Sequence, residues 1–383
     1  MKKTGIMICG HGSRSKEAEI EFGLLAKGLE KKFPTTPVRY GFLEYSSPNI
    51  HMGLDELKAL NVNEIIAVPG MLFAATHAKN DIPSVLTSYK EKNPEITVKY
   101  GRELGLHPEM IAAFQTRILE CLYTAEDSQN TFYDTMLVVV GRGTSDVLAN
   151  AEAAKLTRIV SENMGFGWSE TVYSGVTFPS VGQGLKIITK LGYKKIVVAP
   201  YFLFTGRLID RIYKYVDIIA KENTEIQFFK AKYLSDQDHV ITTFEERIKE
   251  AEAGIIEGNN DLMLSFNERM ARGEVAAHHH HAEFNPITDP EDDEAVSSLG
   301  ESDDHHHGLE HHHGLEHHHT HDHKHHGFYK HIAHPNGPRT MIDEGVCCCF
   351  MSQFPKEVVD NERKKRGEKK NKIIPRPINS TPS

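Results

Sequence analysis

The sequence predicts an α/β protein built from two similar lobes, each with a small parallel sheet flanked by helices, and with a cleft between them. Three observations support this prediction. Short apolar runs alternate with segments of helical pattern, the first run stops at a glycine-flanked histidine in Gly10-His11-Gly12, and the whole arrangement occurs twice. Buried parallel strands are apolar throughout and deliver side chains to the carboxyl edge of the sheet, where α/β proteins place ligands.

A shift of 131 residues, without a gap, relates the two copies. It superimposes Gly10 on Gly141, Gly12 on Gly143, Ser13 on Thr144, Pro48 on Pro179, Gly53 on Gly184, Leu60 on Leu191, Pro69 on Pro200 and Leu72-Phe73 on Leu203-Phe204. So many matches at one offset are not expected by chance. The repeat predicts an N-terminal lobe over residues 1–125 and a C-terminal lobe over residues 126–250.

Each copy carries the same elements in the same order: strand, helix, strand, helix, and a third strand that ends at a proline. The expected strands are 5–9, 38–43 and 64–68 in the first copy, and 136–140, 171–176 and 195–199 in the second, with second helices near 49–60 and 181–191. Strands that alternate with helices of this length are typical of βαβ units and a parallel sheet.

Three side chains that can bind a metal follow strand ends in the first copy, namely His11, Glu44 and His77. We expect them to converge, because the carboxyl ends of parallel strands share one edge. Two imidazoles and a carboxylate suit Co²⁺, Ni²⁺, Fe²⁺ or Zn²⁺ with coordination positions left open, and histidine can also accept a proton near neutral pH. For each residue taken singly, a structural role without chemistry stays an alternative.

The second copy lacks these ligands and has Arg142, Gly175 and Leu208 at the matching positions. None of these side chains binds a metal. Arg142, and Arg207 beside the third position, suit carboxylate binding instead. The pattern predicts a duplicated scaffold in which one lobe is equipped as a metal site.

The CbiX family of sirohydrochlorin chelatases is similar to this chain over about residues 4–245, in motifs with the same order and spacing. These are Gly10-His11-Gly12-Ser13-Arg14, Phe42-Leu43-Glu44 with Pro48, and Pro69-Gly70-Met71-Leu72-Phe73 leading to His77 and Asp81-Ile82-Pro83. The resemblance implies a class II chelatase fold around a tetrapyrrole cleft, and insertion of Co²⁺ into sirohydrochlorin on the way to cobalamin. It implies that His11 and His77 carry metal binding and catalysis, with Glu44 assisting.

Metal insertion must remove two pyrrole protons while ring nitrogens replace the metal's other ligands, so it needs a base beside a loosely held cation and no ATP. We expect His11 and His77 to hold Co²⁺ and one of them to accept a proton, with Glu44 orienting or relaying. Sirohydrochlorin is rich in carboxylates, which calls for basic and N–H donors in the cleft. The candidates, each of which could equally be a surface or capping residue, are Ser13, Arg14, Arg142 and Arg207.

The net charge of −9 arises in one segment of the chain. Residues 1–250 hold 30 basic and 30 acidic side chains, residues 251–346 hold 5 and 19, and residues 347–383 hold 9 and 4. The acidic, histidine-rich segment, residues 251–340, holds 19 of the 24 histidines: 17 in blocks from His278 to His326, and His331 and His334 after them. With few apolar residues it is expected to be disordered without metal, either as a metal buffer or as a solvated tail that binds metal incidentally.

The last segment, residues 341–383, is basic and contains Cys347, Cys348 and Cys349. Long-form relatives of the resembled family can carry an iron–sulfur cluster here on a Cys-x-x-Cys type motif, and this chain departs from that pattern. Three adjacent thiolates fall short of the usual four ligands, so His331, His334 or a second chain would have to supply the fourth. Soft-metal binding and free thiols are the alternatives.

Other function classes find little support in the sequence. Five cysteines make no disulfide framework, and no apolar stretch is long enough for a signal peptide or a membrane span, so we expect a cytoplasmic protein. Ser15 stands where a dinucleotide fingerprint needs its third glycine, so no nucleotide is expected. The basic run 363–366 is offset by nearby acidic residues, so no nucleic-acid partner is expected; an oligomer is compatible with the sequence.

Three functions are therefore open. The first is a cobaltochelatase acting on sirohydrochlorin with Co²⁺ as the substrate metal. The second is the same enzyme class with Fe²⁺ or Ni²⁺, toward sirohaem or a nickel tetrapyrrole. The third is a non-enzymatic metal-storage protein.

Overall fold

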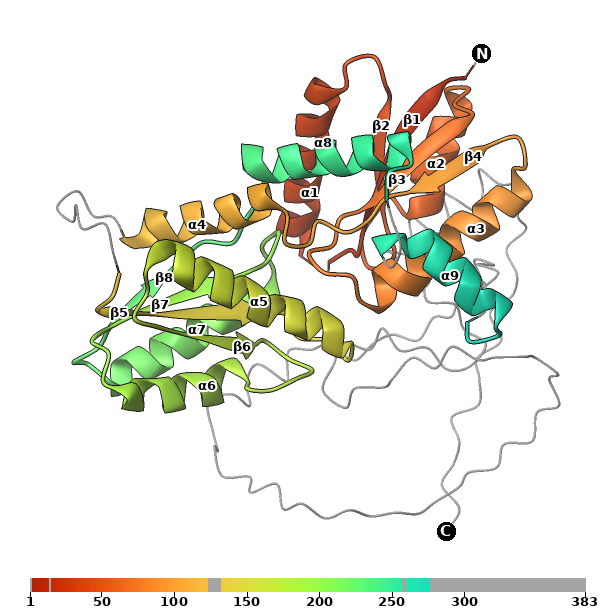
Figure 1. The fold of residues 1–383 in the computed structure, drawn as a ribbon. Helices are drawn as coiled ribbons and strands as arrows, with labels where there is room; N and C mark the ends of the chain where they lie inside the picture. Colours follow the sequence, from red (N-terminus) through yellow and green to blue (C-terminus); the bar gives the residue numbers. More distant parts are fainter. Residues whose placement is uncertain (1, 14, 123–131, 257–259, 276–383) are drawn as a thin grey trace, which may run out of the picture.

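The computed structural model describes residues 2–13, 15–122, 132–256 and 260–275. Within them the chain forms two four-stranded parallel sheets with helices on both faces (Figure 1), which confirms the predicted α/β architecture of two similar lobes. The first lobe contains β1 (Thr4–Gly10), α1 (Lys16–Lys32), β2 (Val38–Phe42), α2 (Ile50–Ala59), β3 (Glu64–Pro69), η1 (His77–Asp81), α3 (Ile82–Lys92) and β4 (Thr97–Tyr100). The remaining elements are α4 (Pro108–Leu122), β5 (Thr135–Gly141), α5 (Val147–Met164), β6 (Trp168–Tyr173), α6 (Val181–Ile188), η2 (Thr189–Leu191), β7 (Lys195–Pro200), α7 (Arg207–Glu222), β8 (Gln227–Lys230), α8 (Asp238–Ala253) and α9 (Leu262–Ala271).

The strand order is β2-β1-β3-β4 in the first sheet and β6-β5-β7-β8 in the second. In the register, Cys9 at the end of β1 pairs with Gly41 of β2 and Pro69 of β3, so all three strands end at the same level. The loops after them, which carry the predicted metal ligands, therefore leave one edge of the sheet.

Two details differ from the sequence prediction. Each sheet has a fourth strand, β4 or β8, whose short and partly exposed sequence gives little apolar signal. The strand expected at 171–176 lies at Trp168–Tyr173, because Ser174 and Val176 already belong to a turn in which the Ser174 N–H bonds to the Gly141 carbonyl and Val176 has φ 67°.

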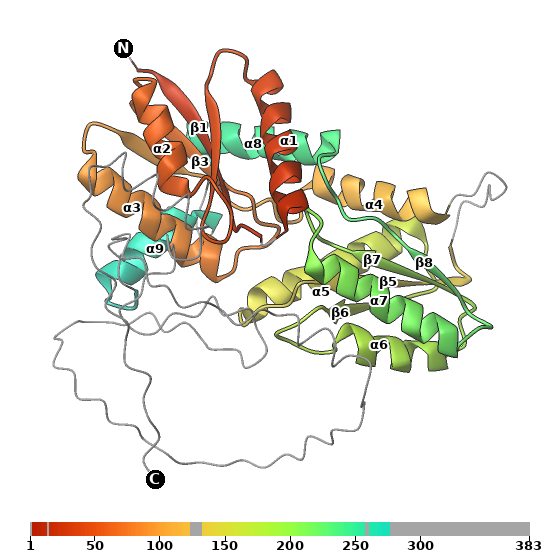
Figure 2. The same ribbon diagram turned by 180° about the vertical axis from the view of Figure 1, so that it is seen from behind.

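The lobes exchange a helix (Figures 1 and 2). Helix α4 leaves the first lobe and packs on α5, β7 and β8, whereas α8 leaves the second lobe and packs on α1, β3 and β4. The buried rings of Phe114 in α4 and Tyr201 after β7 lie 5.1 Å apart, and Arg247 of α8 donates a hydrogen bond to the Leu104 carbonyl. One hydrophobic core, from Ile6 to Ala251, consequently runs through both lobes and fixes their relative position.

The interpretation that the chain from residue 251 onward is an unfolded tail is wrong for its first part. Helix α8 continues to Ala253, and α9 packs on η1 and α3 of the first lobe. Asp261 caps α9 by accepting a hydrogen bond from the Leu264 N–H, and Leu262 and Phe266, one turn apart, are fully buried. These two apolar residues give α9 a face to bury despite the acidic composition around it.

Candidate metal centre

His11 and Glu44 are held together by their backbones. The Glu44 N–H bonds to the His11 carbonyl at 3.0 Å, so the loop after β1 and the loop after β2 run side by side. Gly12 makes this approach possible. It has φ 99°, and a Cβ at this position would lie 1.6 Å from the Glu44 carbonyl oxygen. The glycine after the histidine thus serves close packing of the two loops, and it brings the His11 and Glu44 side chains to one place.

The second lobe contains the same turn without the ligands. Gly143 has φ 81°, and a Cβ there would lie 1.9 Å from the Gly175 carbonyl oxygen. The duplicated backbone therefore brings together Arg142 and Gly175 where the first lobe has His11 and Glu44. The turn is common to both lobes, and the ligand-type side chains belong to the first.

His77 is the first residue of η1, a single π-helical turn in which the Ile82 N–H bonds to the His77 carbonyl. Its Nδ1 lies 2.5 Å from Oδ2 of Asp81, a buried carboxylate that is only 1% exposed. A carboxylate can only accept, so Nδ1 carries the proton and Nε2 has the lone pair. π-Turns are often found at functional sites, and a carboxylate behind a ligand histidine fixes its ring and raises its donor strength.

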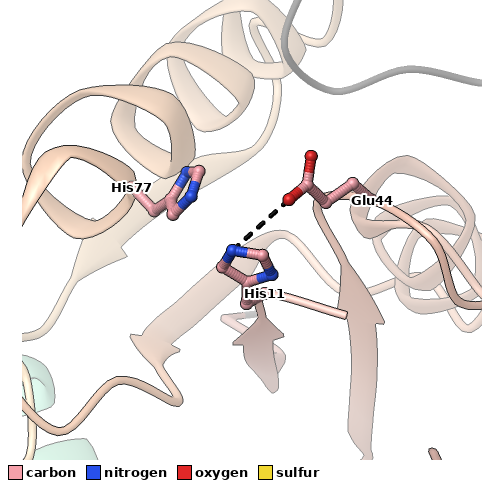
Figure 3. A group of neighbouring side chains, drawn as sticks. All are labelled: His11, Glu44 and His77. Carbon is pink, nitrogen blue, oxygen red and sulfur yellow. Dashed lines mark ion pairs between the residues drawn. The ribbon is translucent and has the colours of Figure 1, made fainter. Parts of the chain in front are cut away.

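His11 has the same tautomer for a similar reason. Its Nδ1 lies 3.1 Å from the Gly12 carbonyl oxygen, which accepts the proton of that nitrogen. Its Nε2 is buried and lies 3.3 Å from Oε1 of Glu44, which is 1% exposed. The His11 and His77 rings stand perpendicular with centroids 4.4 Å apart. Figure 3 shows the three side chains directed toward one another, with His11 between His77 and Glu44 and a dashed line from His11 to Glu44.

One potential ligand atom from each of His11, Glu44 and His77 lies within 4.8 Å of the others, and no other such group of three occurs in the described ranges 2–13, 15–122, 132–256 and 260–275. Two imidazole nitrogens and one carboxylate oxygen are donor atoms of hard to intermediate softness, which suit a divalent transition metal. Three protein ligands leave further coordination positions for water or for an incoming molecule.

The electrostatics of the site keep His11 neutral. Burial lowers the pKa of His11 well below its usual value, electrostatic interactions with His77 and Arg142 lower it further, and the hydrogen bond to the Gly12 carbonyl raises it. A neutral imidazole is the form that binds metal. The adjacent Cys9 thiol is fully buried, which raises its pKa and keeps it protonated, so Cys9 is not suited as a ligand.

Arg142 reaches this site from the second lobe. The Arg142 side chain is exposed, and its electrostatic neighbours belong to the first lobe. Loss of solvation lowers the pKa of its guanidinium, and interactions with Glu44 and Tyr45 raise it again. Another link between the lobes joins Lys79 of η1 to Asp146, the residue that caps α5, in an ion pair. The carboxyl edges of the two sheets therefore face each other around the trio.

The other predicted site residues have different positions. Ser13 lies at the boundary between the lobes, where a Cβ added to Gly206 would lie 3.8 Å from its Oγ, and that Oγ accepts a hydrogen bond from the Ser15 N–H. Arg207 is exposed as the first residue of α7. Arg14, the histidine blocks from His278 onward and Cys347, Cys348 and Cys349 lie outside the described residues.

Three features of the site are absent from the sequence prediction: the Asp81 partner of His77, the ion pair between Lys79 and Asp146, and the packing of α9 on η1. Asp81 could have been found, because a histidine and a carboxylate four residues apart face each other on a helix. The other two join segments 67 and about 190 residues apart, and no local pattern marks them.

In the part of the chain that the structure describes, no helix has the length and apolar character needed to cross a membrane.

Comparison with known proteins agrees with the fold. Among curated proteins, the chain is 34% identical over 265 residues to the sirohydrochlorin cobaltochelatase of Priestia megaterium, covering 67% of this chain and 82% of the relative. It is 28% identical over 244 residues to the sirohydrochlorin ferrochelatase of the same organism, covering 64% of this chain and 88% of the relative.

Among solved structures, SirB from Bacillus subtilis with Fe³⁺ superimposes with a TM-score of 0.59 at 25% identity, covering 68% of this chain and 99% of SirB. The CbiX family model matches twice, at residues 5–121 and 136–251, one match for each copy of the repeat. These two matches span more than half of the sequence. The chain belongs to the CbiX family.

Proposed function

We propose that this chain is a sirohydrochlorin cobaltochelatase, which inserts Co²⁺ into sirohydrochlorin without ATP. The observation that carries the proposal is the convergence of His11, Glu44 and His77 within 4.8 Å at the boundary between two lobes. Such a site holds a divalent metal by three protein ligands and leaves coordination positions through which ring nitrogens can displace them. Membership in the CbiX family supports the same reaction class.

The reaction exchanges one divalent cation for two pyrrole protons, so charge is conserved and no energy-rich cofactor is required. His11 and His77 present Nε2 lone pairs to the metal, and Glu44 adds a negative charge that compensates the cation in a buried site. As the ring nitrogens take over the metal, the same Nε2 atoms become free to accept the protons that leave the ring. Asp81 stabilises positive charge on the His77 ring, which makes His77 the better placed acceptor.

The substrate's carboxylates need positive partners. Arg142 and Arg207 of the second lobe, with Ser13 and Arg14 of the first, are the proposed partners. Arg142 is the best supported of these, because it is within electrostatic reach of Glu44 and His11. A guanidinium can bind a carboxylate with two parallel hydrogen bonds, which would orient the macrocycle over the metal.

The choice of cobalt rests on the 34% identical cobaltochelatase and on the histidine-rich sequence from His278 onward. Iron is the second candidate, because a 28% identical relative is a ferrochelatase and the similar SirB structure was solved with Fe³⁺. The donor set itself accepts Co²⁺, Ni²⁺ and Fe²⁺ alike.

The test is metal insertion into sirohydrochlorin, followed by its absorption spectrum, with Co²⁺, Fe²⁺ and Ni²⁺ supplied in turn at equal free concentration under anaerobic conditions. We expect the wild-type protein to accelerate Co²⁺ insertion most and the double variant His11→Ala/His77→Ala to lose the acceleration. His239→Ala, a half-exposed histidine of α8 that pairs with Glu109, is the matched control. Faster insertion of Fe²⁺ or Ni²⁺ than of Co²⁺ would identify that metal as the substrate. No acceleration with any of the three metals would favour the metal-storage function.

A further inference from the structure

Helix α9 lies beyond the segment that the CbiX family model matches, which ends at residue 251. It is nevertheless an integral part of the first lobe. Leu262 joins the hydrophobic core formed by the β-sheet, α2 and α3, and Met263 packs against the same core. Phe266 is completely buried. Figure 1 shows α9 beside α3.

The polar contact of α9 is made by Arg269. Its Nη1 donates a hydrogen bond to Oδ1 of Asn80 at 2.6 Å, and its Nη2 donates one to the carbonyl oxygen of Lys79 at 2.7 Å. Its Nε donates a hydrogen bond of 3.3 Å to the Ser265 carbonyl oxygen in the preceding turn of α9, which restricts the orientation of the guanidinium. Both acceptors on the other side belong to η1, the turn that begins with His77.

A π-helical turn depends more on outside contacts than an α-helix does, because its wide ring of backbone bonds is intrinsically less stable. Each residue of η1 is held by a specific contact. The Ala78 carbonyl accepts a hydrogen bond from the Tyr100 hydroxyl at 3.0 Å, Lys79 and Asn80 accept those of Arg269, and Asp81 accepts that of His77. Removal of Arg269 would take away the contacts of the Lys79 carbonyl and the Asn80 side chain, while the ion pair of Lys79 with Asp146 stays.

The second lobe provides an internal comparison. At the position of His77 it has Leu208, in the first turn of the regular helix α7, whereas the first lobe has the π-turn η1, on which α9 packs. The π-turn and its supporting helix accompany the lobe that carries the metal ligands. Arg269, which is partly buried, directs both of its contacts with the first lobe to this turn.

We infer that Arg269 is a positioning residue for the metal centre. It acts through Lys79 and Asn80 to fix η1, and so it sets the position of the His77 ring relative to His11 and Glu44 without touching the metal. This inference rests on the proposed metal insertion. A ligand side chain that is already in its binding position binds metal more tightly. We therefore expect Arg269 to increase the affinity of the site for the metal.

The test compares Arg269→Ala with Arg272→Ala in the full-length protein. Arg272 is the C-cap residue of the same helix but is exposed and pairs with Glu274, so its loss controls for general effects on α9. The initial rate of Co²⁺ insertion at saturating sirohydrochlorin is measured against free Co²⁺ fixed by a metal buffer, so that the histidine-rich segment does not change the free concentration. We expect Arg269→Ala to raise the KM for free Co²⁺ about tenfold with a smaller change in kcat, as for other residues behind metal ligands.

Arg269→Lys keeps one donor and the charge but cannot bond to both acceptors, so its KM is expected to lie between those of the wild type and Arg269→Ala. The same set of proteins is compared by hydrogen exchange of the backbone amides in residues 77–82. Faster exchange in Arg269→Ala at these residues, with the melting temperature close to that of Arg272→Ala, supports local positioning. A KM and an exchange rate equal to those of Arg272→Ala overturn it.

Failure of the proposed function has a different signature. A wild-type protein that inserts no metal would refute the chelatase proposal, and the exchange measurement would still decide whether Arg269 holds η1. If Arg269→Ala does not fold, Arg269→Lys carries the comparison. A wild-type-like KM for that variant, with unchanged exchange at 77–82, also contradicts the inference.

Discussion

Lys79 of the first lobe and Asp146 of the second form an ion pair at the edge of the candidate metal centre. Lys79 lies two residues after His77, and Asp146 caps the helix that follows the Arg142-Gly143 turn. The pair therefore joins the turn that carries the proposed metal ligand His77 to the turn that carries a carboxylate-binding candidate. It holds the two lobes together at the place where both contact the substrate in the proposed reaction.

The first prediction concerns this pair. Lys79→Met is expected to raise the KM for sirohydrochlorin up to about fivefold, because a partly buried pair contributes up to about 1 kcal/mol to keeping the lobes in place. Asp146→Asn, which keeps a capping oxygen for α5, should have a similar effect, and the double variant should be no worse than either single one. Lys155→Met, which removes an exposed pair with Glu152, is the control. Full additivity of the two changes would show that the pair has no role.

The second prediction concerns Asp81. Asp81→Asn keeps the size of the side chain but removes the charge that orients His77 and supports its donor strength. We expect a loss of about tenfold to a hundredfold in kcat/KM for free Co²⁺, the range found for carboxylates behind ligand histidines. Asp217→Asn, at an exposed pair with Lys230 in the second lobe, should leave kcat/KM unchanged. A loss below twofold for Asp81→Asn would contradict this role.

The third prediction concerns the two equivalent glycines. Gly12→Ala and Gly143→Ala each place a Cβ against a carbonyl oxygen at a positive φ, and each should cost at least about 1–3 kcal/mol of unfolding free energy. Their effects on activity should differ. Gly12→Ala displaces Glu44 and should raise the KM for metal, whereas Gly143→Ala displaces Arg142 and should raise the KM for sirohydrochlorin. Urea unfolding and steady-state kinetics measure the two effects, and equal changes in both KM values would argue against separate roles for the lobes.

The fourth prediction concerns pH. The pKa of His11 is lowered by burial, by His77 and by Arg142, so below about pH 6.5 the unfolded chain binds a proton at this residue that the native protein does not. Native stability due to His11 is therefore complete above pH 6.5 and falls as the pH decreases, by at most about 1.4 kcal/mol per pH unit. Urea unfolding of the wild type and of His11→Gln between pH 7.5 and 5.5 isolates this effect. A difference between the two proteins that stays constant over this range would show that His11 titrates normally.

The fifth prediction concerns chain length. A chain that ends at residue 275 keeps α9 and should insert metal at the wild-type rate when free Co²⁺ is buffered, because all described contacts of the site are retained. A chain that ends at Gly254 lacks α9 and should have a raised KM for Co²⁺. Loss of activity in the longer truncation would favour metal storage by the C-terminal segment over catalysis by the lobes.

The sequence by itself determined the fold class and which three residues make up the candidate metal centre. Parallel strands that end at one level must present the residues after them at one edge, so the order of strand, glycine turn and ligand was enough to group His11, Glu44 and His77. The 131-residue repeat could also be found from the sequence alone. Comparison of the two copies shows which residues belong to the shared scaffold and which are ligand-type side chains of the first lobe.

Tertiary structure decided what surrounds that centre. The exchange of α4 and α8, the ion pair between Lys79 and Asp146 and the packing of Arg269 on η1 each join segments far apart in the chain. Periodicity and turn motifs report only a residue's own neighbourhood, and a charged side chain such as Arg269 looks the same in sequence whether it faces water or a buried carbonyl. For His11, the position after β1 could be predicted from the sequence. Its neutral state could not, because it depends on burial and on an arginine from the other lobe.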